Sequence, residues 1–82
     1  MTDPAAYHAW YATPRGAWIA GRELALLDEL LRPRPGESVL DVGCGTGYFS
    51  SALAERGLAV TGLDPDLPAL RFVRQRDPRI AL

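Results

Sequence analysis

The chain has 82 residues and a formal net charge of −1, and 48% of its residues are apolar and 23% charged. This composition is typical of one small globular domain and unlike that of a disordered chain. A charge so close to neutral provides no general attraction to nucleic acid or to an anionic membrane, so neither is expected as a partner.

The sequence carries no signal for export, membrane insertion or disulfide bonding. Its N-terminus lacks a basic region followed by an apolar run, and no apolar stretch is long enough to span a bilayer. The single cysteine permits no internal disulfide, which fits a reducing compartment. We therefore expect a cytoplasmic protein.

The first predicted element is a leader over residues 1–13 with a short helix. Tyr7 and Tyr11 are four residues apart, so one helix places both on the same face. The favoured interpretation is that these aromatic side chains pack the leader onto the body of the domain. His8 is expected to be solvated or packed, and no functional role is assigned to it.

A long helix is predicted to begin at Thr13 and Pro14 and to continue to about Leu31. Threonine caps the free N–H groups of a helix start, and proline suits the first helical position. The apolar residues of this helix recur with helical spacing and are interpreted as core that covers a sheet. They are Trp18, Ala20, Leu24, Leu26, Leu27, Leu30 and Leu31.

A strand over residues 38–42 leads into a loop with glycines at positions 43, 45 and 47. The apolar character of the strand predicts a parallel strand that is covered on both faces. Glycine permits a positive φ and lets a ligand approach the main chain. The next helix is expected to be capped by Thr46 and to stop at Gly57. The end of the strand and the start of this helix meet at the glycine loop, where backbone N–H groups are free to bind a ligand.

A second strand over residues 58–63 ends at Asp64, at the sheet edge where open α/β proteins bind ligands. Asp66 is expected to cap a helix over residues 67–76, which Asp77 and Pro78 end. The arginines of this helix are interpreted as a solvated face. They are Arg71, Arg74 and Arg76. Residues 79–82 are expected to begin a third strand.

The loop and the two acids restrict the ligand. A dinucleotide fingerprint needs a third glycine at position 48, which is Tyr48, and Asp41 would repel a pyrophosphate. A P-loop is excluded because no Gly-Lys-Ser/Thr follows. Asp64 can accept both hydroxyls of a ribose. These residues favour a phosphate-free ligand with a ribose and an amine or sulfonium, a description that S-adenosylmethionine meets.

Two motifs carry a family resemblance. LDVGCGTGYFS, residues 40–50, resembles the first cofactor motif of class I S-adenosylmethionine-dependent methyltransferases, and VTGLDPD, residues 60–66, resembles the second. The sequences of these two motifs are most similar to those of the type 11 methyltransferase domains, which include ubiquinone- and menaquinone-type methyltransferases. Residues 7–16 are similar to the leader of some of those proteins.

The resemblance implies an α/β, Rossmann-like methyltransferase fold, of which residues 1–82 form the N-terminal part of a single incomplete domain. Its elements are a leader helix, a long helix, a strand, a helix, a strand, a helix and the start of a third strand. Residues 1–13 are implied to be a lid and residues 14–82 the cofactor-binding half. The implied cofactor-binding residues are Asp41, Gly43, Cys44, Gly45, Gly47, Asp64 and Pro65, with Tyr11 from the lid.

The family resemblance also implies parts that these 82 residues lack. They hold two strands and the start of a third of a seven-stranded sheet, without the acid expected after strand three or the substrate-binding half. We therefore expect the front half of the cofactor site of a methyltransferase that acts on a small-molecule or unknown acceptor. The catalytic residues are unknown, no metal is expected, and the chain by itself is expected to be inactive.

Two other functions remain open. The chain can be a non-catalytic small α/β binding or interaction protein that keeps the glycine loop only as part of its fold. An oxidoreductase with a nucleotide cofactor is a third alternative, against which Asp41 and Tyr48 argue.

Overall fold

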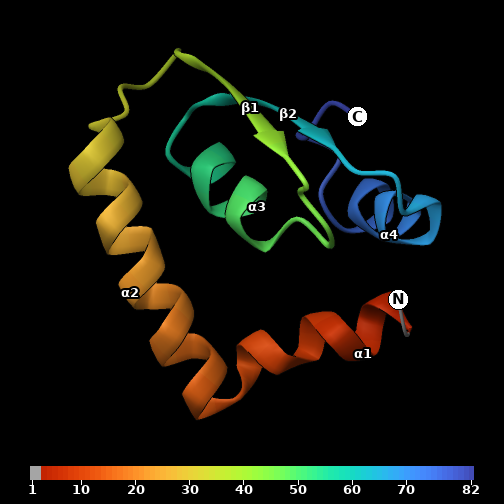
Figure 1. Ribbon diagram of the computed structural model, residues 1–82. Helices are drawn as coiled ribbons and strands as arrows, with labels where there is room; N and C mark the ends of the chain where they lie inside the picture. Colours follow the sequence, from red (N-terminus) through yellow and green to blue (C-terminus); the bar gives the residue numbers. More distant parts are fainter. Residues whose placement is uncertain (1–2) are drawn as a thin grey trace.

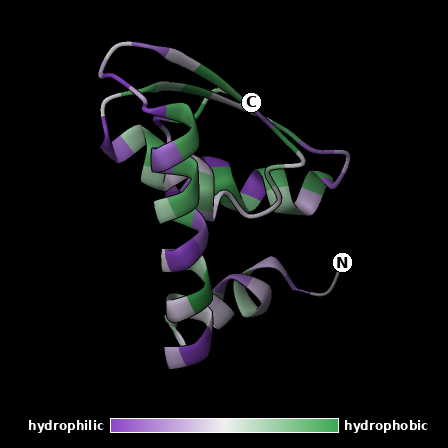
Figure 2. Ribbon diagram, turned by 60° about the vertical axis from the view of Figure 1, so that its left-hand side comes forward, coloured by the Kyte–Doolittle hydropathy of each residue, from purple (hydrophilic) through white to green (hydrophobic). Residues whose placement is uncertain are grey.

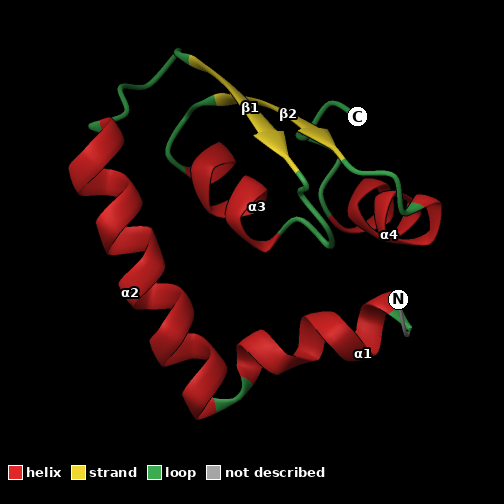
Figure 3. Cartoon of the chain, viewed as in Figure 1, coloured by secondary structure: helices red, strands yellow, loops and turns green. Residues whose placement is uncertain are grey.

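The computed structural model describes residues 3–82. The predicted strands and helices are present in it, and the second strand begins one residue later than predicted (Figures 1 and 3). In chain order the elements are α1 (Pro4–Ala9), the 3-10 helix η1 (Trp10–Ala12), α2 (Pro14–Leu31), β1 (Ser38–Val42), α3 (Tyr48–Glu55), β2 (Ala59–Leu63) and α4 (Leu67–Arg76).

The sheet consists of β1 and β2, which pair in parallel with Val39 opposite Val60 and Val42 opposite Leu63. A third segment joins β2 at its other edge, where Ala81 forms a single parallel bridge with Thr61. The predicted opening of a third strand is thus confirmed. Within residues 3–82, the outer edge of β1 has no strand partner.

The core lies between this sheet and the helices α3 and α4, which both cover one of its faces (Figures 1 and 2). It is formed by Leu53, Leu58, Val60, Val73 and Ile80. On the opposite face the side chains are exposed, and Val42 keeps 74% of its surface accessible. The prediction that the first strand is covered on both faces is therefore wrong for this structure, because helices pack against one face only.

The apolar face of α2 does not cover the sheet as predicted. Its buried residues are Gly16 and Ala20, both in the N-terminal half, whereas Trp18 and Leu30 are about 70% exposed. The helix packs on η1 at its start, and Asp28 near its end pairs with Arg56 of α3 at 2.8 Å. Between these attachments α2 stands away from β1, which leaves an open groove.

The helix ends follow local rules, with one exception. Thr13 Oγ1 accepts the Gly16 N–H at 3.0 Å and Asp66 Oδ1 accepts the Ala69 N–H at 3.1 Å, so both predicted caps are confirmed. The predicted cap by Thr46 is wrong, because Gly47 occupies the cap position in a left-handed conformation and Thr46 turns to another partner. In the described part of the chain, none of the helices has the length and apolar character to cross a bilayer.

Candidate cofactor site

Asp64 is joined to the glycine loop by the loop's own backbone. The N–H groups of Gly43 and Cys44 donate to the Leu63 carbonyl at 2.7 and 3.0 Å, which closes the loop against the end of β2. The next free N–H, that of Gly45, donates to Asp64 Oδ2 at 2.9 Å. The other carboxylate oxygen accepts the Asp66 N–H at 2.8 Å. Each oxygen keeps a lone pair for a ligand, because a carboxylate can accept about four hydrogen bonds.

The three glycines of the loop serve different purposes. All have positive φ, at 77° for Gly43, 56° for Gly45 and 80° for Gly47. No described heavy atom lies within 4 Å of where a Cβ would stand on Gly43 or Gly45, so the loop backbone faces open space there. A Cβ on Gly47 would lie 3.0 Å from a methyl of Val73, so this glycine allows α4 to pack. Gly43 and Gly45 thus leave the backbone accessible to a ligand.

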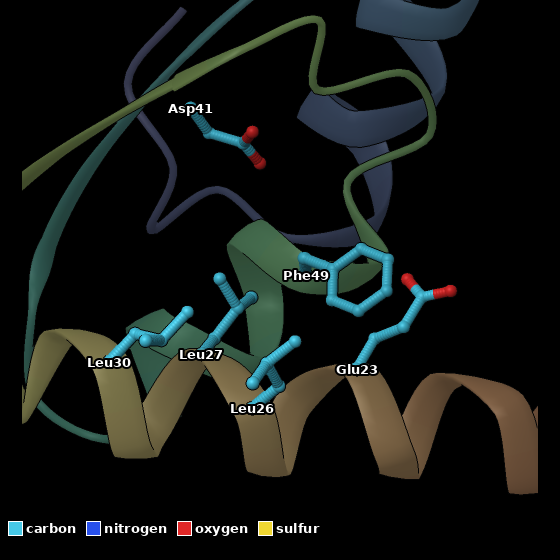
Figure 4. Close-up of a pocket in the computed structure, with 6 residues that line it drawn as sticks. All are labelled: Glu23, Leu26, Leu27, Leu30, Asp41 and Phe49. Atoms are coloured by element: carbon cyan, nitrogen blue, oxygen red, sulfur yellow. The ribbon is translucent and has the colours of Figure 1, made fainter.

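Asp41 faces the groove beside α2. Its Oδ2 accepts the Ser50 hydroxyl at 2.6 Å, which orients the half-buried carboxylate. The groove has a volume of about 340 Å³, and Figure 4 shows the carboxylate directed from β1 toward it. The groove is lined by Glu23, Leu26, Leu27, Leu30, Asp41 and Phe49. Leucine and phenylalanine side chains with two carboxylates suit a ligand that combines apolar surface with a positive charge.

Cys44 is a packing residue in this loop. Its sulfur lies against β2, where a Cβ on Gly62 would come within 2.8 Å of it. Burial, followed by the negative charges of Asp41 and Asp64, raises the pKa of the thiol. The thiol therefore stays protonated and is a poor nucleophile. No cluster of His, Cys, Asp and Glu within residues 3–82 is arranged to hold a metal ion.

Tyr11 connects the leader to the start of α3. Its ring stacks on that of Tyr48 with the centroids 4.1 Å apart, and it meets Phe49 edge-on at 6.2 Å. Burial, with Tyr7 close by, raises the pKa of Tyr11 to about 12, so its hydroxyl remains protonated and can donate a hydrogen bond. Pro65 is exposed beside Asp64. The structure thus groups Asp41, the loop and Asp64, and places Tyr11 next to the aromatic residues that follow the loop.

Two residues that contact the loop were not predicted to do so. His8 Nδ1 lies 2.9 Å from the hydroxyl of Thr46, which is 2% exposed. Arg76 Nη2 donates to the carbonyls of Thr46 and Gly47 at 3.2 and 3.0 Å and to Ser51 Oγ at 2.8 Å. Arg76 is exposed, as predicted, but its contacts with the loop were not predicted. Its partners lie 25 to 30 residues away, and no local sequence pattern signals such contacts.

Comparisons with known proteins show which family the chain resembles. Residues 15–79 match the methyltransferase domain family. An uncharacterized protein of Mycobacterium tuberculosis is 41% identical over 96% of this chain, which covers 26% of that protein. A malonyl-[acyl-carrier protein] O-methyltransferase of Serratia marcescens is 57% identical over 42 residues, or 51% of this chain and 16% of the enzyme. Residues 40–66, with both motifs, lie inside the family match.

A solved structure shares the fold. The TehB-like SAM-dependent methyltransferase of Corynebacterium glutamicum superposes with a TM-score of 0.59 at 21% identity. The match covers 84% of this chain and 44% of that protein. The helix and strand order described above is thus the Rossmann-like order of a methyltransferase. The chain spans about a quarter of the length of the mycobacterial relative.

Proposed function

Because the chain belongs to the methyltransferase domain family, we propose that it binds S-adenosylmethionine and forms the front half of a site for methyl transfer. One observation carries this proposal: the Gly45 N–H holds Asp64 beside a loop whose backbone is open at Gly43 and Gly45. A carboxylate fixed at the end of β2 suits the two hydroxyls of a ribose, and an open backbone suits a ligand that lies against it.

The residues fit this cofactor in their chemistry. Asp64 would hold the ribose hydroxyls, and Asp41 would attract the amine or the sulfonium. Gly43, Cys44, Gly45 and Gly47 would form the wall of the site, with Pro65 at its edge. A pyrophosphate fits these residues poorly, because the carboxylate of Asp41 would repel it.

When bound, S-adenosylmethionine supplies a methyl group on a positively charged sulfur, which a nucleophile can take by direct displacement. The chain's contribution is to orient the cofactor, since positioning can supply much of the rate enhancement of such a displacement. We propose that residues 3–13 act as a lid, with Tyr11 fixed by its stacking on Tyr48. The methyl acceptor is proposed to be a small molecule.

Calorimetric titration tests the cofactor assignment. A protein that contains these 82 residues should bind S-adenosylhomocysteine and show no heat with NAD or NADP. Binding of NAD alone would support an oxidoreductase instead. If none of the three ligands binds to the folded protein, the glycine loop serves only the fold, as in the non-catalytic alternative.

A further inference from the structure

A second pocket lies away from Asp41 and Asp64, between the leader and the helices α2, α3 and α4. Its volume is about 380 Å³, and unlike the groove beside α2 it has a largely polar lining. The polar side chains around it are His8, Tyr48, Ser51, Glu55, Arg56 and Arg76. The proposed methyl transfer assigns none of these six residues a contact with the cofactor, so the pocket needs a separate explanation.

Arg76 brings to this pocket a positive charge that no carboxylate pairs with directly. The guanidinium donates through Nη2 to two carbonyls and one hydroxyl, all of them uncharged. In the described part of the chain, the ion pairs are Arg56 with Asp28 and Arg79 with Asp77, and Arg76 belongs to neither. Burial lowers the pKa of Arg76, while the negative charges of Asp77 and Glu55 act in the opposite direction. A guanidinium that forms no direct ion pair favours the binding of an anion.

His8 completes the polar end of the pocket. Its ring packs on Phe72 and Tyr48 at 5.2 and 6.1 Å, and its Nδ1 bonds to Thr46. Burial and then the charge of Arg76 lower the pKa of His8, so the imidazole is neutral near pH 7. The titratable and charged groups around it are Tyr11 on its own segment, Tyr48, Glu55 and Arg56 on α3, and Arg76 on α4.

We propose that this pocket binds a small oxyanion, a phosphate or carboxylate group, between Arg76 and His8. The guanidinium supplies the charge, while the imidazole and the hydroxyl of Tyr48 supply hydrogen bonds. Arg56 contributes little charge because Asp28 pairs with it. Glu55, the single carboxylate of the lining, opposes the anion and limits its affinity.

Such an anion would connect two parts of the molecule. His8 belongs to the leader, whereas Arg76 holds the carbonyls of Thr46 and Gly47 in the glycine loop. An oxyanion between them would therefore fix the leader against the loop. This site goes beyond the proposed methyl transfer and does not depend on it.

The pKa of His8 is the readout for this proposal. Histidine C2 hydrogen exchange followed by mass spectrometry measures that value for His8 alone at low protein concentration. Phosphate should raise it by about half a unit or more, since a bound anion stabilises the imidazolium. Sodium chloride at the same ionic strength is the control for screening, and acetate in place of phosphate tests whether a carboxylate suffices.

Two variants with matched controls make the test specific to the pocket. Arg76→Gln should abolish the effect of phosphate, and Arg71→Gln, an exposed arginine on the same helix, should leave it intact. Because Arg76→Gln also removes contacts to the loop, Glu55→Gln provides an independent check on an exposed residue. It should strengthen phosphate binding about twofold to fivefold, whereas Glu29→Gln on α2 should not.

Three outcomes would overturn the proposal. An equal rise of the pKa of His8 in sodium chloride would show screening only. A full phosphate effect in folded Arg76→Gln would place the anion elsewhere. Unchanged phosphate affinity in Glu55→Gln would show that the anion does not enter this pocket.

Discussion

At the scale of single residues, Asp64 is the side chain on which the candidate site most depends. It directly follows β2, its carboxylate accepts hydrogen bonds from the N–H groups of Gly45 and Asp66, and each oxygen keeps a lone pair for a ligand. If it holds ribose hydroxyls, Asp64→Asn should weaken binding of S-adenosylhomocysteine by about 1.5–3 kcal/mol, the range for hydrogen bonds to a charged group. Calorimetric titration of a protein that contains the chain measures this change.

A second ligand distinguishes the proposed role of Asp64 from that of Asp41. Methylthioadenosine keeps the ribose and the adenine of the cofactor but lacks its amino acid part. Asp64→Asn should weaken both ligands equally, whereas Asp41→Asn should weaken only S-adenosylhomocysteine. Equal losses for both ligands in Asp41→Asn would contradict the proposed place of the amine. Glu29→Gln, an exposed carboxylate on α2, serves as the control.

The sequence predicts a residue's role where that role depends on near neighbours. Asp64 was predicted from its place at a strand end, and Asp66 from its place before a helix, and both occupy the expected positions. The contacts of Thr46 and Arg76 were not predicted, because their partners come from other elements, 38 and 30 residues away in the chain. Such contacts depend on how helices pack, which propensities and capping rules do not describe.

At the scale of elements, α2 shows how one helix can contain two very different glycines. Gly16 lies where α2 meets η1, and a Cβ there would stand 2.0 Å from the Trp10 carbonyl oxygen. Gly21 lies one and a half turns further along, with no described atom within 4 Å of its Cβ position. The first glycine is therefore required for the corner between the leader and α2, and the second is not.

This pair gives a matched test within one helix. Gly21→Ala should stabilise the protein by about 0.5–1 kcal/mol, because alanine loses less backbone entropy than glycine in a helix. Gly16→Ala should destabilise it, because the new methyl group forces η1 away from α2. Urea unfolding followed by circular dichroism measures both changes. Equal stabilisation by the two variants would show that the corner does not form.

The bounds of α2 were predicted well, but its burial was not. Thr13 and Pro14 mark its start by local chemistry, so the sequence suffices there. Its leucine stripe indicates only that the helix has an apolar face, and does not specify what covers that face. In this structure the stripe borders the groove beside β1, and Leu26 and Leu30 stay exposed.

At the scale of the whole molecule, the fold is a single layer of helices under a two-stranded sheet with one uncovered face. That face carries exposed Leu40, Val42 and Leu63, and β1 borders it with an open edge. The α/β class and the strand order were predictable from the two motifs and their spacing. The uncovered face was not predictable, since the sequence of an apolar strand does not show whether helices cover one face of it or both.

An open edge beside exposed apolar side chains favours association between chains. We therefore expect the 82-residue chain by itself to form dimers or larger species as its concentration rises. Val42→Lys places a charge on the uncovered face, at a position that is 74% exposed, and should shift the chain toward monomer without altering the core. Gln75→Lys adds the same charge on exposed α4 and should change nothing. Size-exclusion chromatography with light scattering at several concentrations measures the mass. A wild-type chain that stays monomeric throughout would show that this face does not drive association, and equal association of the two lysine variants would place the contact elsewhere.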